Sequence, residues 1–219
     1  MTGRATVWHT EAMKDCCEVR ADVPERQRRL LWIVLAINGA MFVAEFVAGI
    51  AASSTALLAD SVDMLGDALV YSFSLCVVAR APVWQARAAL LKGLVMAAFG
   101  IGVLVQVVAK LLNGLHPHAE TMGAIGLLAL AANTACLVML WRRRHDDVNM
   151  RSAWVCSLND VAGNAGVIVA SAAVALTASG WPDILVGLMI AGLFGASAVG
   201  IVRSAVQGLK TGQPAGRAA

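Results

Sequence analysis

The sequence contains few charged residues. Only 14% of its 219 residues are Asp, Glu, Lys or Arg, whereas 59% are hydrophobic. Soluble domains carry about 25% charged and about 45–50% apolar residues. This composition excludes a disordered chain and a nucleic-acid-binding module. With a mean hydropathy of +0.72, the chain is expected to be an integral membrane protein.

Two further absences narrow the class. The five cysteines have no regular spacing, which excludes a disulfide framework, and the period-two alternation of a membrane barrel is missing. About 20 apolar residues are needed for a helix to cross a ~30 Å hydrocarbon core. Six stretches satisfy this, over 31–51, 55–78, 90–112, 121–141, 150–178 and 183–202. The sequence therefore predicts an all-α integral membrane protein with six transmembrane helices.

The basic residues are concentrated on one side of the predicted membrane domain. Lys92, at the start of the third span, is grouped with the second loop. On that count every Lys and Arg except Lys110 lies in the N-terminal tail, in the second or fourth loop, or after the last span. Cytoplasmic loops are enriched in Lys and Arg, so both termini are expected to be cytoplasmic. We expect a cytoplasmic tail over 1–29, a six-helix transmembrane domain over 30–205 and a short cytoplasmic tail over 206–219.

Acidic residues occur inside the predicted spans, where each costs about 2.5–3.5 kcal/mol on insertion scales. These residues are Glu45, Asp60, Asp63, Asp67 and Asp160. No basic residue is expected at a comparable depth to neutralise them. The compensating positive charge is therefore expected to come from a metal ion or from protons.

Two pairs in these spans have the same helical spacing. Asp63 and Asp67 are four residues apart, as are Cys156 and Asp160, so each pair shares one helix face. At a rise of about 1.5 Å per residue, both pairs lie near the membrane midplane. Four ligands match a tetrahedral divalent site. Small side chains would let the two helices approach closely; those beside the pairs are Gly66, Ala68, Ala162, Gly163 and Gly166.

Other polar residues in the spans are predicted to support this site. Asp60 is expected on a different helix face from Asp63, where it caps, hydrogen-bonds or relays protons rather than binding metal. Glu45 is expected either to pack against polar groups or to relay protons. Asn38, Asn133 and Asn164 are predicted to be relay or supporting residues. In the N-terminal tail the adjacent Cys16 and Cys17 would capture metal ions in the cytoplasm, unless they are incidental to a mobile tail.

The two paired motifs resemble those of a known family. Residues 57–69 (LLADSVDMLGDAL) are similar to the second-helix signature of cation diffusion facilitators, in which His or Asp precedes Asp by four residues. Residues 149–160 (NMRSAWVCSLND) resemble the fifth-helix signature, and the resemblance extends over about residues 28–208. It implies proton-coupled export of Zn²⁺ or a related divalent ion from the cytoplasm by a homodimer. It also implies that Asp63, Asp67 and Asp160 are metal ligands.

The sequence departs from the family pattern at two places. Cys156 stands where the family usually has His, and only a short Gly-, Pro- and Ala-rich stretch follows the sixth span. The family commonly carries a cytoplasmic metal-binding domain there, so the chain resembles a truncated type. A site of three carboxylates and one thiolate favours Zn²⁺ and Cd²⁺ over Mg²⁺ and Ca²⁺, with Co²⁺ and Ni²⁺ also compatible.

The sequence therefore predicts a transporter, not an enzyme, in a bacterial inner membrane. Its expected partners are divalent metal ions, protons, membrane lipid and a second copy bound through the transmembrane helices. No nucleic acid and no cofactor are expected. A metal-dependent membrane enzyme is one alternative, which the absence of His from the spans disfavours. A non-transporting accessory membrane subunit is the other, and the doubled spacing of the two pairs disfavours it.

Overall fold

The computed structural model describes residues 25–76, 82–114, 116–146 and 148–211. These residues form six α-helices, and no strand occurs among them, which confirms the predicted all-helical fold. The helices are α2 (Glu25–Ala51), α3 (Thr55–Cys76), α4 (Pro82–Asn113), α5 (Ala119–Trp141), α6 (Val148–Thr177) and α7 (Trp181–Thr211). Cys16 and Cys17 lie outside the described residues.

Several helices are longer than the predicted spans. Helix α4 begins at Pro82 instead of residue 90, and α7 continues to Thr211 instead of ending at 202. The prediction was shorter because it counted only the apolar part of each helix, and a helix can continue beyond the hydrocarbon core. Five of the described helices are long and apolar enough to cross a membrane. The remaining helix, α3, carries three aspartates along its length.

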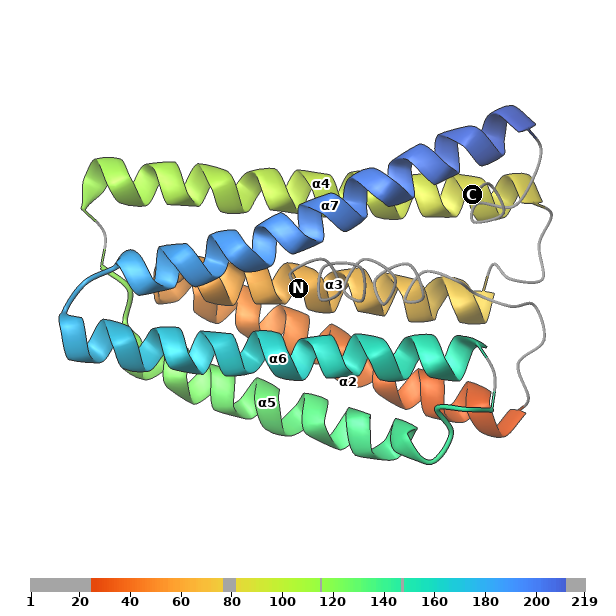
Figure 1. The fold of residues 1–219 in the computed structure, drawn as a ribbon, viewed down its shortest axis with the longest axis horizontal. Helices are drawn as coiled ribbons and strands as arrows, with labels where there is room; N and C mark the ends of the chain where they lie inside the picture. Colours follow the sequence, from red (N-terminus) through yellow and green to blue (C-terminus); the bar gives the residue numbers. More distant parts are fainter. Residues whose placement is uncertain (1–24, 77–81, 115, 147, 212–219) are drawn as a thin grey trace, which may run out of the picture.

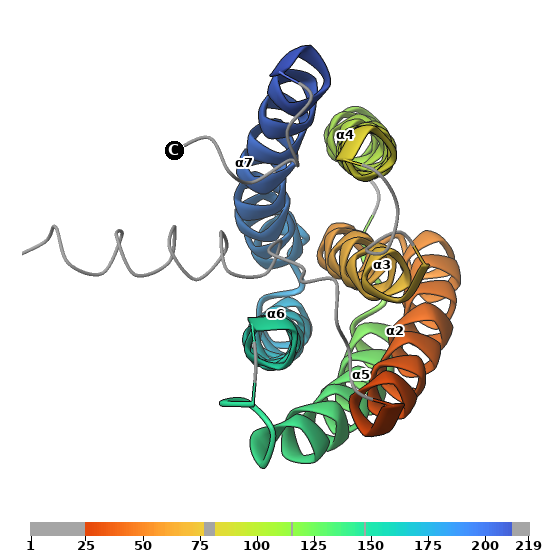
Figure 2. The same cartoon turned by 90° about the vertical axis from the view of Figure 1, so that its right-hand side faces the viewer.

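Helix α3 lies inside the bundle. The helices run side by side along the long axis of the molecule (Figure 1). Seen end-on, α3 is surrounded by α2, α4, α6 and α7 (Figure 2), and it packs against all four. Most side chains of its first fourteen residues are consequently buried. Its aspartates are thus placed among protein neighbours instead of facing lipid.

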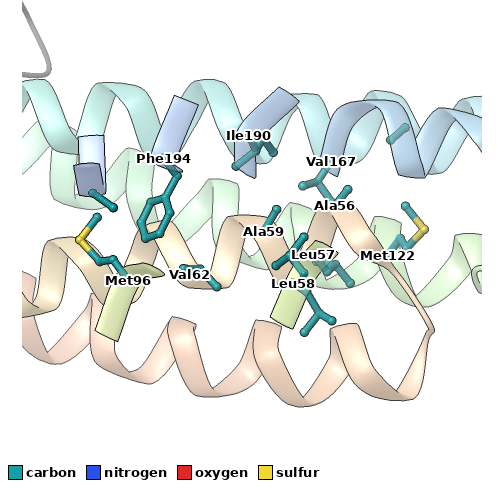
Figure 3. Packing of buried hydrophobic residues seen from close by; sticks show 13 residues of the cluster. Ala56, Leu57, Leu58, Ala59, Val62, Met96, Met122, Val167, Ile190 and Phe194 are labelled. Carbon is teal, nitrogen blue, oxygen red and sulfur yellow. The ribbon is translucent and has the colours of Figure 1, made fainter. Parts of the chain in front are cut away.

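Two large apolar clusters pack between the helices. The first includes Leu57, Val62, Val167 and Phe194, and Figure 3 shows its members packed between the helices. The buried members of the second are Leu31, Val34, Tyr71, Cys136, Leu140, Met150, Ala153 and Cys156. A third, smaller cluster consists of Met41, Met64 and Ala129.

The N-terminus of α3 is capped by a side chain from α7. The carboxylate of Asp183 accepts hydrogen bonds from the backbone N–H groups of Thr55 (2.8 Å) and Ala56 (3.0 Å), and the Ser54 hydroxyl donates to it at 2.6 Å. A negative charge at a helix N-terminus is stabilised by the helix dipole. Lys110 of α4 forms an ion pair with the same carboxylate, and the whole group is buried.

Candidate functional site

Four helices contribute polar side chains to an acidic layer inside the bundle. On α2, α3, α5 and α6 they alternate with apolar residues at helical spacing, so that they point into the bundle. All are buried except Asp63, which is half-buried. The members are Asn38 and Glu45 on α2, Asp60, Asp63 and Asp67 on α3, Asn133 on α5, and Ser157, Asp160 and Asn164 on α6.

The two predicted pairs meet where α3 packs against α6. The Asp67 carboxylate is hydrogen-bonded to the Cys156 thiol of α6. The Tyr71 hydroxyl lies 3.4 Å from Asp67 Oδ2 and 3.4 Å from the carbonyl oxygen of Ala153, so it bridges the two helices one turn away. One member of each predicted pair is therefore in contact with the other helix.

Asp60 also faces α6, and the prediction that it lies on a different helix face is wrong. Its Oδ1 atom occupies the space beside Gly163, only 2.6 Å from where a Cβ atom would stand on that glycine. Asp60 and Asp63 are three residues apart, and side chains at this spacing are neighbours on a helix surface. The charges of the two carboxylates interact with each other. The acidic side chains of α3 near α6 thus include Asp60 as well as the predicted pair Asp63 and Asp67.

These contacts define an antiparallel register between α3 and α6. Tyr71 lies opposite Ala153, Asp67 opposite Cys156, and Asp60 opposite Gly163. Steps of four and then seven residues toward the N-terminus of α3 are matched by steps of three and then seven residues toward the C-terminus of α6. Continuation of this register places Asp63 at the level of Asp160. The four predicted ligands therefore occupy two adjacent levels of one helix–helix contact.

The four side chains are not gathered into a single cluster. Among the residues that the structure describes, no three His, Cys, Asp or Glu side chains are close enough together to hold a metal ion. The contacts bring Asp67 to Cys156, while the level of Asp63 and Asp160 follows from the register. The predicted ligand set therefore remains a prediction.

The small residues beside the pairs do not all serve the contact between α3 and α6. A Cβ atom on Gly66 would lie 3.2 Å from both the Met96 and the Phe194 side chains, which belong to α4 and α7. One on Gly166 would lie 3.6 Å from Val186 of α7. Gly163 is the glycine that lets α3 and α6 approach, because it accommodates the Asp60 carboxylate.

The predicted relay residues lie beside this contact. The charge of Glu45 interacts with those of Asp60 and Asp63. Within the described part of the chain, the carboxyl oxygens of Glu45 and Asp60 accept no hydrogen bond. The carboxamide nitrogens of Asn38 and Asn164 donate to backbone carbonyls of their own helices, at 2.9 and 2.7 Å.

The sequence suggested that no basic residue lies at the depth of the acids, and the structure shows that one does. Lys92 of α4 is buried, and its charge acts on both Asp63 and Asp67. The prediction placed Lys92 at the start of the third span and counted it with the cytoplasmic loop before it, but α4 begins ten residues earlier, at Pro82. The available signal was a lone lysine between the apolar residues 88–91 and 93–99. Lys110, counted as the single basic residue on the opposite side, is paired with Asp183.

This arrangement defines a multi-pass helical membrane protein with a buried acidic layer at the centre of its bundle. The chain belongs to the family described by the cation efflux transmembrane domain, whose model matches residues 31–209. This match confirms the resemblance found in the sequence.

Three curated relatives cover most of the chain. The metal cation efflux system protein CzcD of Cupriavidus metallidurans is 27% identical over 183 residues, which are 77% of this chain and 57% of CzcD. The cadmium, cobalt and zinc/H(+)-K(+) antiporter of Bacillus subtilis is 23% identical, covering 84% of this chain and 64% of the relative. The zinc transporter ZitB of Escherichia coli is 28% identical, covering 85% and 64%. The chain thus spans less than two thirds of the length of each relative.

Proposed function

We propose that the chain exports divalent heavy-metal cations from the cytoplasm across a bacterial inner membrane in exchange for protons. The transported ions would be Zn²⁺ and Cd²⁺, with Co²⁺ and Ni²⁺ also compatible with the ligand types. Membership of the cation efflux family and the names of the relatives support metal export. The single observation that carries the choice of site is the contact of Asp67 with Cys156 across the α3–α6 interface.

The proposed ion-binding residues are Asp63, Asp67, Cys156 and Asp160. The shared register supports this set, because it brings one carboxylate and one further ligand to each of two adjacent levels. Small rotamer changes in side chains at matching levels can then close four ligands around one ion. Two levels separated by one helical turn, about 5.4 Å, lie within the span of a tetrahedral site with flexible carboxylates.

Exchange for protons follows from the chemistry of these ligands. Carboxylic acids and thiols must lose their protons before they bind a metal ion, so proton and metal compete for the same atoms. Metal entering from the cytoplasm would displace protons, and protons entering from the other side would displace metal. Glu45 and Asp60 adjoin the site, and we propose that they relay protons to it. Asn38, Asn133 and Asn164 would line that route and orient the carboxyl groups.

Dimerisation and metal capture complete the proposal. A homodimer would form through the transmembrane helices, as the family resemblance implies. Cys16 and Cys17 would capture metal ions in the cytoplasm before they enter the bundle. A membrane enzyme would require an open metal coordination position and activated water, and a ligand set without His makes transport the better explanation.

The test is metal flux in proteoliposomes. The purified protein is reconstituted in vesicles with an acidic interior, and Zn²⁺ or Cd²⁺ uptake is followed with an enclosed fluorescent indicator. We expect uptake that requires the pH gradient and stops when an ionophore collapses it. Metal binding without flux would favour an enzyme, and neither binding nor flux would favour an accessory subunit. Glu120→Gln, an exposed acid at the start of α5, is the matched control and should leave flux unchanged.

A further inference from the structure

Lys92 is a buried cation within a long apolar helix. Its residue is 5% exposed, and it lies on α4 between apolar stretches. A buried ammonium group carries a desolvation cost of several kcal/mol unless an anion compensates it. Among the described residues the only other buried lysine is Lys110, which Asp183 neutralises. The compensating anion for Lys92 must therefore be supplied by its own neighbours.

The packing of α4 on α3 identifies these neighbours. The Met96 methyl group and the position of a Cβ atom on Gly66 are 3.2 Å apart, so Met96 marks the level of Gly66. Lys92 is one turn from Met96 on the same face of α4. Because α4 runs antiparallel to α3, Lys92 lies about one turn beyond Asp67 toward the cytoplasmic end. A lysine side chain spans one turn, and the charge of Lys92 acts on Asp63 and Asp67.

We propose that Lys92 is a specificity-determining residue of the ion site, acting as an internal counter-charge that the transported ion displaces. In the absence of an ion its ammonium group neutralises the Asp63–Asp67 pair. A divalent metal ion that coordinates these carboxylates replaces that charge and repels it. This inference deepens the proposed function and rests on it.

The counter-charge has two physical consequences. An ion gains access only if its bonds to carboxylate and thiolate outweigh the loss of the lysine pair, which excludes weakly coordinating monovalent cations. The displaced ammonium group also lowers the affinity for the bound ion, and moderate affinity allows release on the other side of the membrane. Lys92 would thus lower the affinity for the bound ion, and in doing so it would raise the transport rate and the selectivity for divalent metal ions.

The experiment compares Lys92→Met with Arg87→Gln in the purified full-length protein. Both variants remove one positive charge from α4, but Arg87 is exposed and lies over the Trp84 ring, away from the site. Equilibrium binding of Cd²⁺ is measured in detergent, and KM and maximal rate are measured in proteoliposomes. We expect Lys92→Met to tighten Cd²⁺ binding by at least about tenfold, because a like charge next to the ion has been removed. Its maximal rate should fall, while Arg87→Gln matches the wild type.

Two further variants separate charge from structure. Lys92→Arg keeps the charge and should bind Cd²⁺ within about threefold of the wild type, because the Coulomb interaction is retained. Lys92→Gln keeps a hydrogen-bonding head without charge and should behave like Lys92→Met, and it serves in place of Lys92→Met if that variant does not fold. Unchanged or weaker Cd²⁺ binding in the uncharged variants would overturn the proposal. A wild-type protein that neither binds nor transports metal would instead overturn the proposed function.

Discussion

Lys110 and Asp183 form a buried ion pair between the last turn of α4 and the first turn of α7. The Asp183 carboxylate also accepts the backbone N–H groups of Thr55 and Ala56, so three helices converge on one side chain. The pair lies at the end of the bundle opposite to the start of α2 and the end of α7 (Figure 1). The pair thus ties the first turn of α3 to both α4 and α7.

Asp183→Asn should destabilise the protein substantially. The substitution removes the negative charge but leaves Lys110 buried, and breaking one side of a buried pair costs about 3–5 kcal/mol. Asp146→Asn is the control, because its pair with Arg143 is 3.7 Å long and partly exposed to solvent. That substitution should cost less than about 1 kcal/mol. Thermal unfolding in detergent measures both, and equal melting temperatures for the two variants would show that the buried pair does not hold the bundle end together.

Replacing the proposed ligands should stop transport without preventing folding. We expect Asp63→Ala, Asp67→Ala and Asp160→Ala each to abolish metal flux, because every ligand lost removes a charge and a bond from the ion. Membrane insertion should persist, since an acid in a span is unfavourable for insertion. Flux in proteoliposomes and protein yield in membranes are measured together. An Asp160→Ala variant that transports at the wild-type rate would remove Asp160 from the site.

Much of this organisation follows from the sequence because it depends on spacing along one helix. The six helices and the two pairs could be predicted in this way. The contacts between helices could not, because they depend on how helices pack. Lys92 approaches Asp67 through the packing of α4 on Gly66, and Asp183 reaches Thr55 across 128 residues of sequence. The orientation of Asp60 toward α6 depends equally on Gly163.

Gly163→Ala tests the contact between α3 and α6. The added Cβ atom would stand 2.6 Å from Asp60 Oδ1, so the carboxylate must move or the helices must separate. Overpacking of this kind costs about 1–3 kcal/mol. Gly166→Ala is the matched control on the same helix, because its Cβ atom would meet Val186 at an ordinary 3.6 Å.

A second substitution shows whether Asp60 is the group that clashes. In an Asp60→Ala background the Oδ1 atom is absent, so Gly163→Ala should cost little further stability. In a double-mutant cycle, the effects of Gly163→Ala and Asp60→Ala on stability should therefore be non-additive. The effects of Gly166→Ala and Asp60→Ala should simply add. Purely additive effects of Gly163→Ala and Asp60→Ala on the melting temperature would contradict the packing of Asp60 against α6.

Cys156 decides the metal preference if it is a ligand. Thiolates select soft ions more strongly than imidazoles do, so Cys156→His should keep Zn²⁺ transport and weaken Cd²⁺ transport relative to it. Cys156→Ser and Cys156→Ala should lower the transport of both ions, because neither side chain supplies an anionic ligand. A packing role alone predicts little cost for Ala or Ser, since buried cysteine behaves as a small apolar residue.

The hydrogen bond between the Cys156 thiol and Asp67 adds a third arrangement, in which Cys156 orients the carboxylate without binding the ion. Ser retains that hydrogen bond and Ala does not, so the two variants separate orientation from coordination when Cd²⁺ and Zn²⁺ fluxes are measured in the same vesicles. Equal losses in Ser and Ala, with a shifted Cd²⁺:Zn²⁺ ratio in His, indicate a ligand. Near-normal flux in Ser with loss in Ala indicates an orienting role. An unchanged ratio and rate in all three variants would remove Cys156 from the site and leave the ion to the three carboxylates.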